Sequence, residues 1–126
     1  MKKILIIDDE SGIITILKKY FVKSGYEVLT SIGGEEGLKM VQIRPEVDLI
    51  ILDIKMPKVT GITIAQEMRK MNMKTPVIFL SGSMGAMKFM DELKKIGYGE
   101  DDVLMKPIKL ELILEEVKKR VSNGQK

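Results

Sequence analysis

The sequence predicts an α/β protein, a doubly wound sheet of five parallel strands with helices on both faces. Five short apolar runs alternate along the chain with segments whose apolar residues recur at helical spacing. The runs at 4–7 and 49–52 are apolar at every position, which is typical of strands buried on both faces. With 126 residues, 44% of them hydrophobic, the chain suits one compact domain with one core.

The first half of the chain contains three of the strands and two helices. After the first strand, apolar residues recur every three or four positions, which places them on one face of a helix. Gly25 ends that helix, because glycine readily adopts the left-handed conformation that follows a last turn. The expected elements are strands at 3–7, 26–30 and 48–52 and helices at 11–24 and 34–42.

The second half continues the alternation. Pro57 and Gly61 bracket a loop, and Pro76 precedes another apolar run. Residues 1–121 are expected to form the domain and residues 122–126 a disordered tail, because the last five residues carry no apolar pattern. The expected elements are helices at 61–71, 84–96 and 109–121 and strands at 77–80 and 103–105.

Composition excludes several kinds of chemistry. The chain has no cysteine and no histidine, which excludes disulfides, a Cys/His zinc site and catalysis by either side chain of this chain. The net charge of +3 is mild and evenly spread, which argues against nucleic acid as a direct partner. The apolar run after Lys2 and Lys3 is too short for an export signal, and no run could span a membrane, so we expect a cytoplasmic protein without membrane contact.

Four of the predicted strands end in polar side chains. The first ends in Asp8 and Asp9, the third in Asp53, the fourth in Ser81 and the fifth in Lys106. In doubly wound sheets the functional site lies beyond the carboxyl ends of the strands. Taken singly, the acids and the serine read as helix caps or turn residues and the lysine as a solvated one. Four strand ends carrying mutually useful groups favour a shared site instead.

These groups suit phosphoryl transfer. Three clustered carboxylates repel one another unless a cation lies among them, and Mg²⁺ prefers oxygen ligands. One carboxylate can also act as a nucleophile and take a phosphoryl group, whose oxygens a metal ion, a lysine and a hydroxyl can stabilise. Asp53 stands alone at its strand end, so we take it as the acceptor, with Asp8 and Asp9 holding the ion.

The chain resembles, over nearly all of its length, the receiver domain of bacterial and archaeal two-component response regulators. The motifs that carry the resemblance lie at 4–10, 48–57, Gly61, 77–81 and 101–107. The resemblance implies a flavodoxin-like three-layer sandwich with strand order 2-1-3-4-5. It also implies that the chain is a signalling domain rather than an enzyme, one that assists its own phosphorylation and dephosphorylation.

The resemblance assigns a role to each site residue. Asp53 would accept the phosphoryl group from a phosphohistidine of a sensor histidine kinase or phosphotransfer protein. Asp9 and Asp53 would bind Mg²⁺ directly, Asp8 would act largely through water, and the backbone carbonyl of Lys55 would complete the protein ligands. The Ser81 hydroxyl and the Lys106 ammonium would contact the phosphoryl group. The peptide bond between Lys106 and Pro107 would be cis, which is plausible only before proline.

The sequence departs from the family pattern in a few places. Val103 stands where the family usually has Tyr or Phe, three residues before the lysine, and Tyr98 is a candidate substitute within a lengthened link at 94–101. Lys55 and Ser83 occupy variable positions that tune phosphoryl loss in the family, and we expect Lys55 to prolong the phosphorylated state. Thr60 replaces a residue that is usually acidic.

A partner surface is also expected. Met87 in the helix at 84–96 and Leu112 in the last helix fall on the polar side of their helices. A single exposed apolar residue is common on any surface. In receivers, however, the face formed by 84–96, 103–105 and 109–121 docks a downstream protein.

Three functions remain open at this point. The leading one is a stand-alone phosphoacceptor switch, because no output domain follows residue 121, and a piece of a longer regulator is its variant. The second is a small Mg²⁺ phosphohydrolase. Such enzymes resemble Asp-x-Asp at the nucleophile, however, and here the residue two positions after Asp53 is Lys55. The third is a docking module that no longer needs phosphorylation, which Val103 favours and the intact acid, serine and lysine set opposes.

Overall fold

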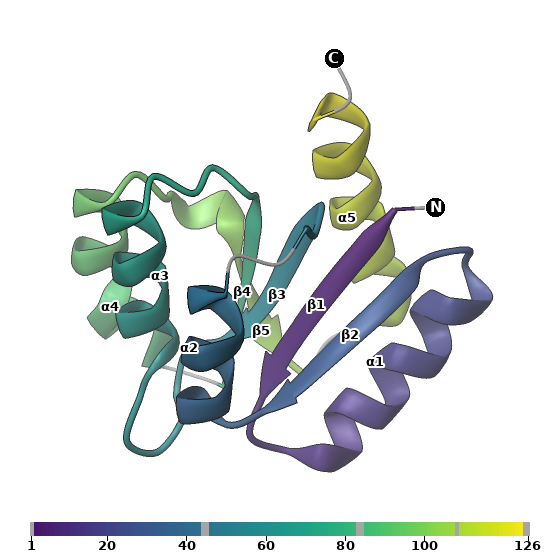
Figure 1. The fold of residues 1–126 in the computed structure, drawn as a ribbon, viewed down its shortest axis with the longest axis horizontal. Helices are drawn as coiled ribbons and strands as arrows, with labels where there is room; N and C mark the ends of the chain where they lie inside the picture. The colour runs from purple at the N-terminus through teal and green to yellow at the C-terminus, as the bar shows by residue number, and fades with distance from the viewer. Residues whose placement is uncertain (1, 44–45, 83–84, 108, 125–126) are drawn as a thin grey trace.

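The computed structural model describes residues 2–43, 46–82, 85–107 and 109–124. All five strands pair in parallel in the order β2-β1-β3-β4-β5, which confirms the predicted fold (Figure 1). The strands are β1 Lys3–Asp8, β2 Glu27–Ile32, β3 Leu49–Asp53, β4 Val77–Gly82 and β5 Val103–Lys106. The helices are α1 Ser11–Lys23, α2 Gly34–Gln42, α3 Gly61–Lys70, α4 Gly85–Lys95 and α5 Leu110–Gly124, with a 3₁₀ turn, η1, at Glu100–Asp102.

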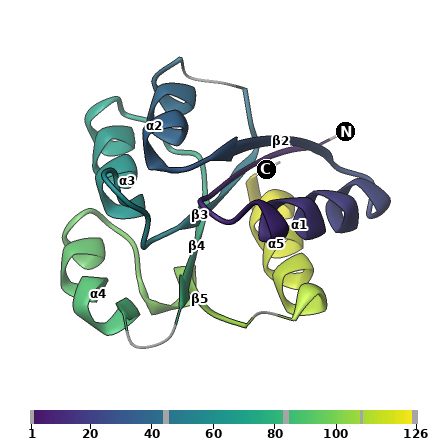
Figure 2. The ribbon, with the colours of Figure 1, turned by 90° about the horizontal axis from the view of Figure 1, so that it is seen from below.

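The sheet separates two layers of helices. Helices α1 and α5 cover one face, and α2, α3 and α4 cover the other (Figures 1 and 2). Because side chains alternate along a strand, each central strand contributes to both cores. In β1, Ile4 and Ile6 pack beneath α1 and α5, while Leu5 and Ile7 pack beneath the other three helices.

Element boundaries differ from expectation mainly at the carboxyl ends. Three of the predicted site residues, Asp8, Asp53 and Lys106, are the last residues of strands rather than the first residues of loops. Helix α5 ends at Gly124, so residues 122–124, expected in a disordered tail, continue the helix, and residues 125–126 lie outside the described part. Across the described residues, no helix has the length and apolar character needed to cross a membrane.

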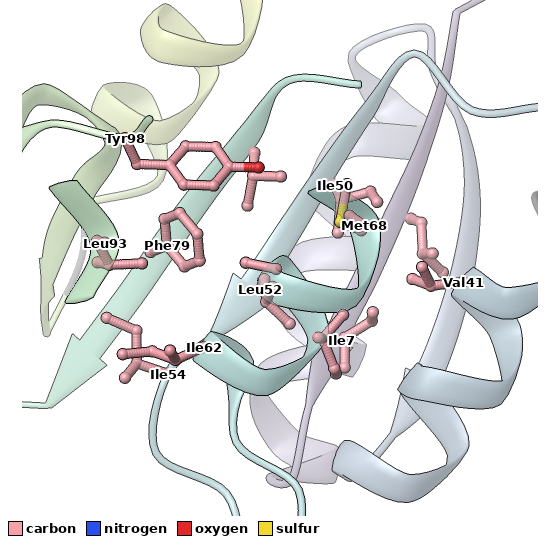
Figure 3. Packing of buried hydrophobic residues seen from close by; sticks show 14 of the residues in the cluster. Ile7, Val41, Ile50, Leu52, Ile54, Ile62, Met68, Phe79, Leu93 and Tyr98 are labelled. Carbon is pink, nitrogen blue, oxygen red and sulfur yellow. The ribbon is translucent and has the colours of Figure 1, made fainter. Parts of the chain in front are cut away.

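The link between α4 and β5 is more ordered than the sequence suggested. The Tyr98 ring is buried and packs edge-to-face on Phe79, with ring centroids 4.9 Å apart (Figure 3). The guanidinium of Arg69 lies 4.4 Å from the Tyr98 ring centroid, and its Nε donates a hydrogen bond of 2.7 Å to the carbonyl of Ile96. Burial raises the pKa of Tyr98. Tyr98 is thus an inward-facing aromatic residue anchored to α3, beside β4.

Candidate functional site

The carboxyl ends of the strands meet at one edge of the sheet, toward the viewer in Figure 2. Three predicted site residues, Asp8, Asp53 and Lys106, continue the alternation of side chains that pack beneath α1 and α5 and therefore share that face. The residue of β4 paired with Lys106 is Gly82, which has no side chain. The lysine therefore has room to cross β4 and reach the two aspartates.

Lys106 joins three carboxylates. Its ammonium Nζ donates a hydrogen bond of 3.2 Å to Oδ2 of Asp8 and lies 3.6 Å from Oδ1 of Asp53. A third carboxylate oxygen, Oε1 of Glu10, also lies 3.6 Å from Nζ. The side chains of Asp8 and Asp53 are only 0% and 4% exposed, so these ion pairs are poorly screened by solvent.

The electrostatics of Asp53 favour a cation at this edge. Burial, followed by the negative charge of Asp8, raises the pKa of Asp53 from 3.8 to about 7, although Lys106 acts in the opposite direction. The pKa of Lys106 is also raised, because the attraction of Asp53 and Asp8 outweighs the lowering effect of its own burial. One ammonium therefore does not fully compensate the buried carboxylate of Asp53, and a further positive charge would stabilise its ionised form.

A hollow of about 460 Å³ opens beside Asp53. Asp9 and Lys55 are exposed and line it. Carboxylate oxygens of Asp8, Asp9 and Glu10 lie within 4.8 Å of one another. Within this group the carboxylates of Asp8 and Asp9 suit a hard divalent cation such as Mg²⁺, which prefers oxygen ligands. The full lining is Asp9, Glu10, Asp53, Lys55, Met56, Pro57, Gly82 and Lys106.

Ser81 is placed differently from the other predicted site residues. It is buried near the end of β4 and follows Leu80, which pairs with Asp53 across the sheet. By strand alternation its side chain is on the face of Phe79, beneath α3 and α4, and not on the face of Asp53. Ser81 is not among the described residues that line the hollow. The structure therefore brings the acids and the lysine together and leaves the serine adjacent to them.

Glu10 belongs to the site although the sequence reasoning did not select it. It contacts Lys106 and lines the hollow beside Asp53. The signal in the sequence is its place directly after two acids at a strand end. The strand pattern points only to the residues at the strand end, whereas Glu10 is the N-cap residue of α1.

Other expectations have mixed outcomes. The Lys106–Pro107 peptide bond is cis, as the resemblance implied. Val103 is partly buried against the core and pairs with Phe79 in the sheet. The expectations for Ser83 and for the side chain of Met87 fall outside the described part of the chain.

The expected partner face carries two exposed apolar side chains. Leu112 on α5 is 51% exposed, as predicted from its place on the helix. Met105, at the penultimate position of β5, is 50% exposed, and the sequence reasoning did not single it out. Both residues belong to elements of the surface that was expected to dock a downstream protein.

Comparisons with known proteins agree on one domain type. The family model described as "Response regulator receiver domain" matches residues 4–118. The alkaline phosphatase synthesis transcriptional regulatory protein PhoP of Bacillus subtilis is 36% identical over 106 residues, which are 84% of this chain and 42% of that protein. The response regulator SaeR of Staphylococcus epidermidis is 36% identical over 107 residues, 85% of this chain and 44% of that protein. The chain thus spans less than half the length of these relatives.

Solved structures match over almost the whole chain. A CheY-like response regulator receiver domain protein from Methanospirillum hungatei superimposes with a TM-score of 0.89 at 26% identity, covering 99% of this chain and 97% of that one. The receiver domain of the Francisella response regulator 1452 superimposes with a TM-score of 0.84 at 29% identity, covering 98% of each chain.

Proposed function

This chain belongs to the response regulator receiver domain family of two-component systems, and from that premise we propose that it is a Mg²⁺-dependent phosphoacceptor switch with Asp53 as the acceptor. The observation that carries the proposal is the ion-paired cluster at the strand ends. Asp53 is a nearly buried carboxylate that shares the Lys106 ammonium with Asp8, and it lines an open hollow. A phosphoryl donor could approach the carboxylate through that hollow.

Each residue of the cluster has a task in the proposed reaction. An oxygen of Asp53 forms a bond to phosphorus while the bond from phosphorus to the histidine nitrogen of the donor breaks. Lys106 neutralises charge on the transferred oxygens. Asp8, Asp9, Asp53 and the carbonyl of Lys55 would hold Mg²⁺, which supplies the remaining positive charge. Ser81 would contact a phosphoryl oxygen after a shift at the end of β4.

The direct test is phosphoryl acceptance by wild type and Asp53→Asn. With Mg²⁺ and acetyl phosphate, the wild-type chain should gain the mass of one phosphoryl group, and with beryllofluoride its NMR spectrum should change around the hollow. Both responses should be lost in Asp53→Asn, because an amide is not a nucleophile of this kind. Labelling that persists in the variant, or a wild-type chain that responds to neither reagent, would contradict the proposal.

Lys55 is proposed to prolong the phosphorylated state. Its side chain is exposed and lines the hollow beside Asp53, where a positive charge can attract the phosphoryl oxygens and obstruct the approach of water. Lys55→Ala should shorten the half-life of the aspartyl phosphate by roughly 1.5- to 5-fold, the range expected for one exposed charge.

The matched control for this prediction is Lys58→Ala. Lys58 lies in the same loop and pairs with Glu35 at 3.2 Å, and it is not among the described residues that line the hollow beside Asp53. The half-life, followed by loss of radiolabel or of the added mass, should be the same in this variant as in wild type. Equal half-lives for wild type and Lys55→Ala would remove Lys55 from the proposed mechanism.

We propose that the output of the switch is a protein contact on the α4, β5 and α5 face. Met105 and Leu112 provide exposed apolar area there, and such area suits a docking surface when polar groups surround it. Lys88, Asp91 and Lys95 on α4 are exposed and charged, as expected for the rim of such a surface. The kinase or phosphotransfer partner would instead approach the hollow at the strand ends.

A further inference from the structure

Glu10 is an unusual residue for the N-cap position of a helix. Glu10 is the N-cap of α1, but its side chain makes no capping hydrogen bond. Glutamate is not among the preferred N-cap residues, whose short side chains can reach the backbone N–H groups of the first turn. Its Oε1 instead lies 3.6 Å from the ammonium of Lys106. The side chain thus contacts a residue of the proposed phosphoryl site rather than its own helix.

The backbone of Glu10 is fixed by the same cluster. Its N–H donates a hydrogen bond of 2.9 Å to Oδ1 of Asp8, while Oδ2 of Asp8 accepts from Lys106. The two carboxylate oxygens of Asp8 thus link the backbone of Glu10 to the side chain of Lys106. This arrangement limits where the Glu10 carboxylate can lie, although that side chain is 61% exposed.

The three acceptors of Lys106 are divided between two segments. Asp8 and Glu10 belong to the β1–α1 segment, and Asp53 belongs to β3. The ammonium lies nearer to Asp8, at 3.2 Å, than to Asp53, at 3.6 Å. If Asp8 and Asp9 serve a metal ion, as in the proposed function, Glu10 is the carboxylate of this segment that remains available to the lysine.

We propose that Glu10 is a positioning residue that restrains Lys106 on the β1–α1 side, so that phosphoryl binding at Asp53 must overcome the Glu10–Lys106 contact. The inference rests on the proposed function of Asp53. It adds that the affinity of the site for a phosphoryl group is set partly by this third acid, which competes with the phosphoryl oxygens for the same ammonium.

The test measures beryllofluoride affinity in saturating Mg²⁺ for wild type, Glu10→Gln and Glu35→Gln. Glu10→Gln preserves the size of the side chain but removes its charge, and it should bind beryllofluoride roughly 2- to 5-fold more tightly than wild type, because an exposed ion pair has been released. Glu35 is the matched control: it is an exposed acid at the same edge of the sheet, but it pairs with Lys58. Glu35→Gln should change the affinity by less than half as much.

A second measurement follows the lysine directly. The NMR signal of the Lys106 side-chain ammonium, recorded without beryllofluoride, should move in Glu10→Gln and stay in place in Glu35→Gln. Thermal unfolding should show that both variants remain folded. A Glu10→Gln affinity equal to that of Glu35→Gln, a weaker affinity than wild type, or an unmoved Lys106 signal would each overturn the inference. Failure of the wild-type chain to bind beryllofluoride would instead refute the proposed function of Asp53.

Discussion

Replacing Gly34 by alanine should destabilise the protein by at least about 2 kcal/mol, because a backbone oxygen occupies the space that the new methyl group needs. Gly34 is the buried first residue of α2. A Cβ at this position would overlap the carbonyl oxygen of Val59 and would stand 2.6 Å from its carbonyl carbon. Val59 lies in the loop between β3 and α3, the loop that also carries Lys55. The clash can be relieved only by moving this loop or helix α2.

The matched control for this substitution is Gly12→Ala. Gly12 is also in the first turn of a helix, α1, but nothing lies within 4 Å of an added Cβ. Alanine should stabilise the protein there by about 0.4–1 kcal/mol, because it favours the helix and restricts the unfolded chain. Urea unfolding of both variants measures the two effects. If Gly34→Ala proves as stable as wild type, the close approach of α2 to the β3–α3 loop is not a feature of the folded protein.

The fold was predictable because the central strands are apolar on both faces. Residues 4–7 and 49–52 leave few alternatives to strands covered by helices on both sides. The strand order came from the resemblance to receivers and not from periodicity, since several orders satisfy the same pattern. The last helix was predicted too short because its apolar stripe ends at Val121, whereas backbone hydrogen bonding continues to Gly124.

Part of the candidate site could be predicted and part could not. Strand ends in parallel sheets meet at one edge, so Asp8, Asp53 and Lys106 could be grouped from the sequence alone. The face on which a side chain lies is fixed by strand alternation only where the strand continues. Strand β4 extends to Gly82, two residues beyond the predicted end, so Ser81 still alternates with its neighbours and lies on the face opposite Asp53.

The contacts of the long link before β5 were beyond sequence reasoning. Tyr98 could be identified as an aromatic residue near Val103, but it packs against Phe79 and Arg69, which are distant from it in the sequence. The ring is already inside the core in this structure. Since Val103 has no ring that could rotate and the Tyr98 ring is already buried, we expect communication from the proposed phosphoryl site to run through the ends of β4 and β5.

Asp53→Asn should make the protein more stable than wild type at pH 8 in the absence of divalent cations. The pKa of Asp53 is raised from 3.8 to about 7 by burial and then by the charge of Asp8, so the folded protein favours the protonated carboxyl. Between pH 4 and pH 7 the folded state therefore binds more protons at this position than the unfolded state does. The contribution of Asp53 to the free energy of unfolding must therefore fall over this pH window and level off above it.

The size of this effect follows from the pKa shift. Each pKa unit corresponds to about 1.4 kcal/mol, so the contribution of Asp53 to the loss of stability has a ceiling of about 4 kcal/mol. Urea unfolding of both proteins across the pH range isolates the contribution of Asp53, because titrations common to the two proteins cancel when their free energies of unfolding are subtracted. That difference should grow as the pH rises toward 7 and then stay constant.

Added Mg²⁺ should reduce the difference between wild type and Asp53→Asn at pH 8. An ion that binds the folded wild type stabilises it by mass action, and it compensates the carboxylate charge that burial makes unfavourable. The amide of the variant offers the ion one charge less, so the variant should gain less stability. A difference that is independent of pH and unchanged by Mg²⁺ would show that the buried charge of Asp53 is already balanced by Lys106, and that no cation is needed at this edge of the sheet.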